Sequence, residues 1–411
     1  MQVFSEIGAL RKVLLHRPGR ELESLTPQYL DSMLFEDIPF LERMQEEHDA
    51  FAGTLRQHGC EVLYVEQLLS DLLMEPQLRS RLTEMTLSGS RIPSLAIREQ
   101  LQRVLEAMDE RELAQHLIGG VRKDELHDEL IGSRENLAYF IRDEYPFYIS
   151  PLPNLYFTRD PGAVIGRICA INRMHTGART RETVLLSAIA SHHPALRDTP
   201  GEAVTVLEGY TGESSIEGGD ILVLNERTVA VGCSARSEAW AIEALANRIL
   251  SDDGSDGGFR QMLVVQIPFT RAYMHLDTVF TMVDQDKFTI YPGVEPHLRL
   301  FTITRTADGP LRIVPEEGLR PALKKVLHLG AVDLIKTGGG DRITAAREQW
   351  NDSTNTLAIA PGVVVTYRRN VVSNDTLAKH GITVLPIRGS ELVRGRGGPR
   401  CMSMPLHREL L

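Results

Sequence analysis

The sequence predicts an α/β protein whose core is assembled from a repeated strand–helix–strand unit. Short apolar runs recur along the whole chain, and amphipathic segments separate several of them, which is typical of α/β folds. The stretch LRQHGCEVLYVEQLL near the start has an echo, LAKHGITVLPIRGSEL, near the end, and such recurrence indicates a repeat architecture. A third observation is a change in sequence pattern between about residues 74 and 144, which indicates an insertion into this repeating pattern.

The predicted strands are apolar runs bounded by glycine, proline or charged residues. In chain order they are KVLLH, CEVLYV, AVIGRICAIN, DILVLNERTVAVG, MLVVQI, VFTMV, FTIYPGV, TLAIAPGVVVTY and ITVLPI. The predicted helices between them include EEHDAFAGTLRQ, SEAWAIEALANRIL and PALKKVLHLG. In both copies of the echo a helix ends at His-Gly, where glycine favours a helix C-terminus, and a buried strand follows.

The segment from about residue 74 to 144 is predicted to be helical. It contains EPQLRSRLTEM, IREQLQRVLEAMD and ERELAQHLIGG, which have helical periodicity, high charge and no strand pattern. The strand pattern resumes at YPFYISPLPNLYFTRD, and no flexible linker is evident after it. We therefore expect one catalytic domain over residues 1–411, interrupted by a helical insertion at about 74–144.

Composition excludes several classes of protein. With 42% hydrophobic and 24% charged residues, the chain has the composition of a soluble globular protein. It begins without a secretory signal and has no apolar run long enough to span a bilayer, so we expect a cytoplasmic protein that does not bind membranes. A net charge of −10 with no basic stripe argues against a nucleic-acid partner.

The four cysteines form neither a disulfide framework nor a zinc motif. Cys60 and Cys169 lie in strand-like runs and Cys233 ends a predicted strand, so these three are interpreted as small buried hydrophobic residues. Cys401 differs, because it follows the glycine-rich, cationic turn in GRGGPRCMSMP and has few apolar neighbours on its N-terminal side. We expect Cys401 to be an exposed, reactive thiol.

A cysteine nucleophile needs a nearby acid or base and a group that orients it. The segment MHLDTVF has His275 and Asp277 two residues apart, so both face one side of an extended chain. SSIEGGDILVLN has Glu217 and Asp220 around two glycines, and PNLYFTRDPGAVIG has Asp160 before Pro-Gly. Read singly, these segments also fit a solvated pair or half of a metal site, a polar tight turn, and an Asp-Pro-Gly β-turn.

Taken together, these residues indicate a cationic substrate. A guanidinium is planar and permanently charged, and its fork of donors matches two carboxylates beside a thiol. Arginines in turns, namely Arg179, Arg236 and Arg396, would hold an anionic group at the other end of the substrate. An amino acid with a guanidinium tail and an α-carboxylate meets both demands.

The segments NLYFTRDP, IEGGD, MHLDT and GRGGPRCMSMP, in this order, resemble the arginine deiminases of the guanidine-modifying enzyme superfamily. The resemblance runs from the opening VFSEIGALRKVLLHRPG to the C-terminus and includes the helical insertion. It implies a five-fold pseudosymmetric α/β propeller of ββαβ units with an inserted helical bundle, and an active site on the central axis.

The resemblance also implies a role for each residue that matches a family motif. Cys401 matches the nucleophile, His275 the general acid and base, and Glu217 the carboxylate that orients the histidine. Asp160 and Asp277 match the pair that grips the guanidinium. Five further residues match positions that line the pocket around the amino-acid end: Asn154, Phe157, Arg179, Arg236 and Arg396.

The implied reaction converts L-arginine to citrulline and ammonia through a covalent intermediate on Cys401, and requires no metal or organic cofactor. Cationic surroundings would favour the thiolate, whereas nearby carboxylates would oppose it until the cationic substrate enters. Arg400 precedes the nucleophile where some relatives carry histidine, which bears on how strongly the thiol is acidified. We also expect a homo-oligomer, a dimer or larger.

Four other functions are compatible with parts of the pattern. An amidinotransferase would use the same intermediate, a dimethylarginine hydrolase would lack such an insertion, and a catalytically dead arginine-binding protein would not need the intact site. A metallohydrolase would use His275 with Glu217 and Asp220. The segment LFEDIPF near the N-terminus is a candidate to cover the pocket.

Overall fold

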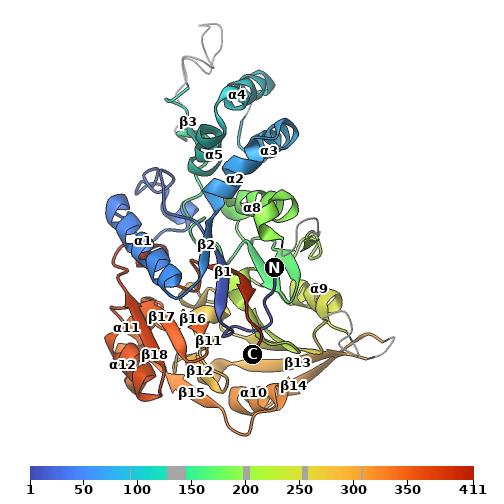
Figure 1. Cartoon of the computed structure of the whole chain (residues 1–411), viewed down its shortest axis with the longest axis vertical. Helices are drawn as coiled ribbons and strands as arrows, with labels where there is room; N and C mark the ends of the chain where they lie inside the picture. Colours follow the sequence, from blue (N-terminus) through green and yellow to red (C-terminus); the bar gives the residue numbers. More distant parts are fainter. Residues whose placement is uncertain (93, 127–144, 198–203, 252–257, 307–308) are drawn as a thin grey trace.

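The computed structural model describes residues 1–92, 94–126, 145–197, 204–251, 258–306 and 309–411 (Figure 1). Within these residues, five sheets contain the same three-stranded arrangement, in which the middle strand pairs antiparallel with one neighbour and parallel with the other. A crossover that contains a helix joins the middle strand to its parallel partner, as parallel pairing requires. The chain therefore repeats one ββαβ connectivity.

The elements of these units follow the order of the sequence, except that the last strand completes the first unit. The first unit comprises β19 (Met404–Arg408), β1 (Leu10–Leu15), α1 (Leu41–Gln57) and β2 (Glu61–Tyr64). The second comprises β5 (Gly162–Ile165), β6 (Ile168–Ile171), α8 (Thr180–His192) and β7 (Thr205–Leu207). The third comprises β8 (Ile221–Asn225), β9 (Thr228–Cys233), α9 (Ala239–Ile249) and β10 (Gln261–Gln266).

The last two units lie in the C-terminal half of the chain (Figure 1). The fourth comprises β11 (Phe280–Met282), β12 (Lys287–Ile290), α10 (Leu319–Leu327) and β15 (Asp333–Lys336). The fifth comprises β16 (Leu357–Ala360), β17 (Val363–Tyr367), α12 (Val371–Lys379) and β18 (Thr383–Ile387), preceded by α11 (Arg342–Trp350). A hairpin of β13 (Arg299–Arg305) and β14 (Leu311–Glu316) extends the third sheet at β10.

Local sequence explains these elements. All of β9 up to its last residue is buried, and such continuous apolar runs are typical of strands covered on both faces. In α10 the buried residues are Leu319, Ala322, Leu323 and Val326, which is the spacing of one helical face. The helix ends at His328, whose φ of 55° is left-handed and typical of a helix C-terminus.

Four consecutive helices follow β2 and extend away from the sheets (Figure 1). They are α2 (Val65–Leu73), α3 (Pro76–Ser88), α4 (Leu95–Ala107) and α5 (Glu110–Gly119), and a small sheet of β3 (Val121–Arg122) and β4 (Phe147–Ile149) follows. The side chain of Asp109 caps α5 by accepting hydrogen bonds from the amides of Arg111 and Glu112. Residues 127–144 of the predicted insertion lie outside the described residues.

Burial agrees with the interpretation of three of the cysteines. Cys169 and Cys60 are buried in two different apolar clusters, and Cys233 is half-buried against the first of these. All four cysteines are free thiols. In the part of the chain that the structure describes, no helix has the length and apolar character needed to cross a membrane.

Candidate active site

Each of the five units contributes a polar side chain just before its first strand. Asp160 precedes β5, Glu217 precedes β8, Asp277 precedes β11 and Cys401 precedes β19. Asn355 precedes β16 in the same way, and its side chain contacts Cys401. Sequence reasoning missed Asn355, although its position in the repeat could have indicated it.

Cys401 lies among polar groups that its own segment does not supply. The Nδ2 atom of Asn355 donates to the Cys401 Sγ atom at 3.0 Å, and Asn355 Oδ1 accepts from the Cys401 amide at 2.9 Å. The thiol in turn lies 3.6 Å from the Oδ2 atom of Asp277. Only 3% of Cys401 is exposed, so the expectation of an exposed thiol is wrong: the glycine-rich turn packs against Asn355 and Phe157 instead of solvent.

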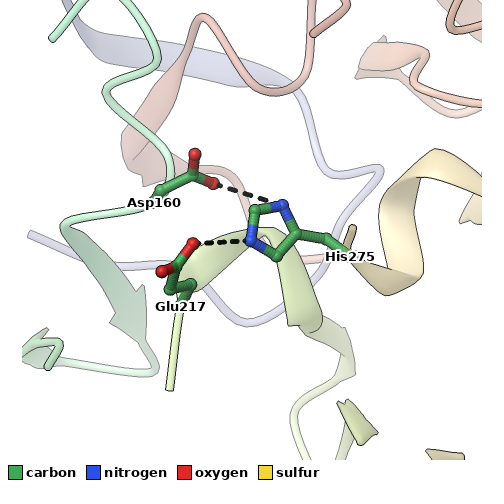
Figure 2. Close-up of side chains that lie close together, drawn as sticks. All are labelled: Asp160, Glu217 and His275. Atoms are coloured by element: carbon green, nitrogen blue, oxygen red, sulfur yellow. Dashed lines mark hydrogen bonds and ion pairs between the residues drawn. The ribbon is translucent and has the colours of Figure 1, made fainter. Parts of the chain in front are cut away.

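His275 is held between two carboxylates (Figure 2). Its Nε2 atom lies 2.8 Å from Glu217 Oε2, and its Nδ1 atom lies 3.8 Å from Asp160 Oδ1. Gly219 makes this position possible, because a Cβ atom there would lie 2.6 Å from ring atoms of His275. Of the two glycines between Glu217 and Asp220, Gly219 thus admits the imidazole, whereas Gly218 lies against the backbone of Arg159.

The buried carboxylates set the charge of this pair. Burial alone would lower the pKa of His275, but Asp160, the hydrogen bond with Glu217 and the charge of Asp220 outweigh it and raise the pKa to about 9. Burial would raise the pKa of Glu217. The hydrogen bond with His275, the positive charge of His275 and the charge of Arg236 outweigh burial and lower the pKa of Glu217 to about 2. The pair is therefore an imidazolium and a carboxylate at neutral pH.

Asp160 is anchored through one of its two oxygens. Arg179 Nη1 donates to Asp160 Oδ2 at 2.6 Å, and the same guanidinium donates to Glu182. The other oxygen, Asp160 Oδ1, is buried and accepts no hydrogen bond. Arg179, predicted to hold the amino-acid end of a substrate, is committed here to two carboxylates and to the carbonyls of Asn154 and Phe157.

Asp277 is anchored in the same manner. Arg400 Nη1 donates to Asp277 Oδ2 at 2.7 Å, while Arg400 Nε donates to Glu6 Oε2 at 3.1 Å. The Oδ1 atom of Asp277 is buried and accepts no hydrogen bond. A buried acceptor without a donor is costly, and two such oxygens beside one thiol therefore form a site for a ligand with several N–H donors.

The thiol does not ionise readily in these surroundings. Burial raises the pKa of Cys401 well above its ordinary value, and Asp277, Asp160 and Asp352 raise it further, opposed by Arg400. Arg400 lowers the pKa of the thiol, as expected of a cationic neighbour, but burial and the three carboxylates outweigh it. The opposing effect expected of the carboxylates is confirmed.

Asp220 binds the backbone next to His275. Its Oδ2 atom accepts from the hydroxyls of Ser234 and Ser237, and its Oδ1 atom accepts from the Leu276 amide at 2.7 Å, next to His275. Burial raises the pKa of Asp220 to about 7. Because its oxygens are occupied in this way, Asp220 is a support for the segment of His275 and not a member of the predicted metal set.

Donor atoms of Asp160, Glu217 and His275 lie within 4.8 Å of one another, close enough to bind a metal ion. Each residue also has a partner of another kind. Glu217 Oε1 accepts from the His175 amide, and Glu217 Oε2 pairs with His275. Imidazolium at this position would be repelled by a cation, so the charge state of His275 disfavours a metal ion here.

The remaining predicted residues surround the same region. Arg396 is in a left-handed conformation with φ 65°, its guanidinium lies 3.5 Å above the Trp350 ring, and its Nε and Nη1 atoms have no hydrogen-bond partner. Arg236 Nη1 donates to Thr176 at 2.7 Å and lies 4.0 Å from Glu217. Phe157 packs where a Cβ of Gly397 would lie.

A cavity of about 320 Å³ opens beside Arg396. Its lining includes Trp350, Arg369 and Arg394, together with Glu36 and Asp37. Glu36 and Asp37 belong to the LFEDIPF segment, which was predicted to cover the pocket, so this segment forms part of the cavity wall. Asn154, in contrast, donates its amide to the carbonyl of Met33 at 2.7 Å, just before that segment.

Comparison with known proteins places the chain among named relatives. A family model described as arginine deiminase matches residues 31–408. The arginine deiminase of Streptococcus sanguinis (strain SK36) is 48% identical over 411 residues, which are 100% of this chain and 98% of that protein. Arginine deiminase 1 of Staphylococcus epidermidis (strain ATCC 12228 / FDA PCI 1200) is 47% identical over 414 residues with the same coverage.

Solved structures resemble the fold at low sequence identity. SxtG, an amidinotransferase from Microseira wollei, has a TM-score of 0.54 at 12% identity, with 100% of this chain and 98% of that one covered. Unliganded AgrE has a TM-score of 0.54 at 14% identity over 97% of this chain, which spans only 40% of the length of AgrE. The predicted mixed α/β class is confirmed, and this chain shares its fold with these solved structures.

Proposed function

The chain belongs to the arginine deiminase family, whose members act on carbon–nitrogen bonds, and we propose that it hydrolyses L-arginine to L-citrulline and ammonia. The observation that supports this most directly is that two buried oxygens, Asp160 Oδ1 and Asp277 Oδ1, accept no hydrogen bond, and that the Asp277 carboxylate lies beside the Cys401 thiol. A guanidinium carries N–H donors on all three of its nitrogens and a permanent positive charge, so it would satisfy both oxygens at once.

Binding of the substrate cation would also prepare the nucleophile. The carboxylates that raise the pKa of Cys401 would be neutralised by the guanidinium, which lowers the cost of forming the thiolate. Asn355 would continue to donate to the sulfur and so stabilise the anion. Once the thiol has released its proton to solvent, the thiolate would attack the central guanidinium carbon, which the two aspartates hold and polarise.

His275 would move the protons of both half-reactions. As the attack forms a bond between sulfur and carbon, the imidazolium would donate a proton to the departing nitrogen, and ammonia would leave. The neutral imidazole would then take a proton from water, whose oxygen attacks the same carbon. Collapse breaks the sulfur–carbon bond, releases the remaining hydroxyl proton to the departed ammonia or solvent, yields citrulline and restores the thiolate. Glu217 would keep the imidazole oriented throughout.

We assign the amino-acid end of the substrate to the side of the cavity near Arg396. The Nε and Nη1 atoms of Arg396, which have no hydrogen-bond partner, and the half-buried Arg236 are cationic groups that could bind an α-carboxylate. Asn154 and Phe157 would complete the wall of this pocket, as the family resemblance implies. Arg179 would take part only by giving up one of its present contacts.

The proposal is tested by incubating the protein with arginine in buffer that contains no amine acceptor. Citrulline and ammonia in equal amounts are expected, and mass spectrometry of an acid-quenched reaction should detect an amidino adduct on the peptide that contains Cys401. Ammonia release that requires an added amine would instead identify an amidinotransferase, and arginine binding without turnover would identify a dead binding protein. Loss of activity with a chelator would favour a metallohydrolase that uses His275 and Glu217.

Four broader predictions accompany the reaction. We propose that the five ββαβ units pack around a common axis as a pseudo-five-fold propeller, with the strand-end residues pointing to that axis. We further propose that residues 1–411 act as one catalytic domain with a helical insertion at about 74–144. Assembly as a homo-oligomer and a cytoplasmic location stay predictions from the sequence.

A further inference from the structure

We propose that Glu6 is a positioning residue for the proposed reaction, on which this inference rests: through Arg400 it fixes the Asp277 carboxylate so that Oδ1 stays free for a guanidinium. Glu6 belongs to the N-terminal segment ahead of β1, and Arg400 lies 394 residues further along the chain. None of the motifs that indicated the site includes Glu6.

Three side chains form a continuous buried string. Glu6 Oε2 accepts from Arg400 Nε at 3.1 Å, and Arg400 Nη1 donates to Asp277 Oδ2 at 2.7 Å. Glu6, Arg400 and Asp277 are 6%, 1% and 0% exposed, respectively, so water does not compete for these contacts. A guanidinium that is bound at both edges has one orientation, and it therefore presents a fixed donor to Asp277.

Backbone groups fix Glu6 and Arg400, the first two members of the string. Glu6 Oε1 accepts from the Val223 amide at 3.1 Å, and Arg400 Nη2 donates to the Ile221 carbonyl at 2.8 Å. Both backbone groups belong to β8, the strand that follows Glu217. The string thus ties the Cys401 segment and Asp277 to the same strand that carries the partner of His275.

Glu6 also balances a buried excess of positive charge. Burial would raise the pKa of Glu6, but Arg400, Arg159 and Arg408 lower it to about 2, so it is an anion at neutral pH. Without that anion, Arg400 would direct its whole charge at Asp277 and, next to it, at Cys401. Asp277 would then hold a substrate guanidinium less strongly, because its own charge would be more fully neutralised.

The opposite aspartate is held by a string of the same composition. Arg179 bridges Asp160 Oδ2 and Glu182, just as Arg400 bridges Asp277 Oδ2 and Glu6. In each string an arginine occupies one oxygen of the aspartate, and a glutamate neutralises the arginine. The recurrence supports a positioning role for Glu6, because a contact made only for stability would not need to reproduce the arrangement.

The test replaces Glu6 and titrates the thiol. The charged groups that act on Cys401 are Asp277, Asp160, Asp352 and Arg400. In Glu6→Gln the unbalanced Arg400 should stabilise the thiolate, so the pKa of Cys401 should fall by about one pH unit. It is measured from the pH dependence of iodoacetamide labelling, with the Cys401 peptide resolved by mass spectrometry. The kcat/KM for arginine should fall about tenfold, mainly through KM.

Two further variants make the result decisive. Glu348→Gln is the matched control, since Glu348 is also buried but binds the amides of Val372 and Ser373; it should lower Tm and leave the thiol pKa unchanged. Glu6→Asp retains the charge, so the thiol pKa should return to the wild-type value while kcat/KM stays about threefold lower because of its shorter reach.

An unchanged thiol pKa in Glu6→Gln, or an equal change in Glu348→Gln, would overturn the proposal. If Glu6→Gln does not fold, the Glu6→Asp variant tests the proposal. A wild-type kcat/KM in Glu6→Asp would also overturn the proposal. The thiol titration needs no turnover. A wild-type protein that makes no citrulline would therefore refute the proposed function without deciding the effect of Glu6 on Cys401.

Discussion

The Oδ2 atom of Asp277 lies 3.6 Å from the Sγ atom of Cys401, so the thiol faces a carboxylate that opposes its ionisation. The other oxygen of this carboxylate accepts no hydrogen bond, and in the proposed mechanism it would accept one from the substrate guanidinium. A cation that binds there would remove the charge that suppresses the nucleophile. In the proposed mechanism Asp277 would thereby connect substrate binding to activation of the thiol.

Asparagine at Asp160 or Asp277 should impair catalysis more than it impairs folding. A charge-assisted hydrogen bond to a buried cation contributes about 2–3 kcal/mol, so kcat/KM should fall by at least about thirtyfold. Tm and kcat/KM are measured on the same samples of Asp160→Asn and Asp277→Asn. If the aspartates only formed turns, Tm would fall while the kinetics of the folded fraction stayed normal.

Cys401→Ala should abolish citrulline formation and leave the fold intact. The thiol is the nucleophile of the proposed mechanism, and removal of a nucleophile costs at least about a thousandfold in kcat. Cys60→Ala is the control, because Cys60 lies in an apolar cluster, and it should retain activity with a lower Tm. A Cys401→Ala protein with a tenth of wild-type turnover would refute a covalent mechanism.

The His275–Glu217 pair should stabilise the fold in a defined pH range. The folded pKa of His275, about 9, lies above the ordinary value of 6.5, so the pair contributes fully below about pH 6.5 and progressively less as pH rises to 9. Thermal unfolding of wild type and Glu217→Gln is compared at pH 6 and pH 9. The difference in stability should shrink from pH 6 to pH 9, by only part of what the whole rise of the His275 pKa would give, because Asp160 and Asp220 also raise that pKa and remain in the variant. A constant difference would contradict an ionic pair.

Gly219→Ala should inactivate the protein by displacing His275. The added Cβ would lie 2.6 Å from Cγ and Nδ1 of the imidazole, which a buried ring cannot tolerate without moving. Positioning errors of about 1 Å cost roughly a hundredfold in rate. Gly53→Ala is the control, because nothing lies within 4 Å of its Cβ in α1, and it should raise stability by about 0.5–1 kcal/mol with normal activity. Equal kcat in the two variants would argue against the assigned role of His275.

Agmatine, which lacks the α-carboxylate of arginine, should be a very poor substrate. Arg396 has two unpaired donors, and Arg236 lies in the same region, so both should bind that carboxylate. Arg396→Ala should therefore reduce kcat/KM for arginine by about thirtyfold or more and leave the low value for agmatine nearly unchanged. If the wild type had comparable kcat/KM values for arginine and agmatine, the assignment of Arg396 and Arg236 to the α-carboxylate would be wrong.

Much of the fold could be predicted from the sequence because its signals are local. Strand and helix periodicity is set by neighbours within a few residues, so the α/β class and the helices of the insertion were accessible. The recurrence of HGCEVLYV in HGITVLPI indicated the repeat, and β2 and β18 do occupy equivalent positions as the parallel partners of β1 and β17. The extension of the third sheet by β13 and β14 was not predicted, because those strands lack a distinct apolar run.

Site residues could be predicted from the sequence where a short segment identifies them. Their electrostatic interactions with residues distant in the sequence could be determined only from the tertiary structure. Cys401, His275 and Glu217 are marked by glycines and strand ends within their own segments. Whether the thiol is buried, and whether it is acidic, depends on Asp277 and Asn355, which are 124 and 46 residues away. Electrostatic interactions and burial act through space and not along the chain, and so only the folded structure decides them.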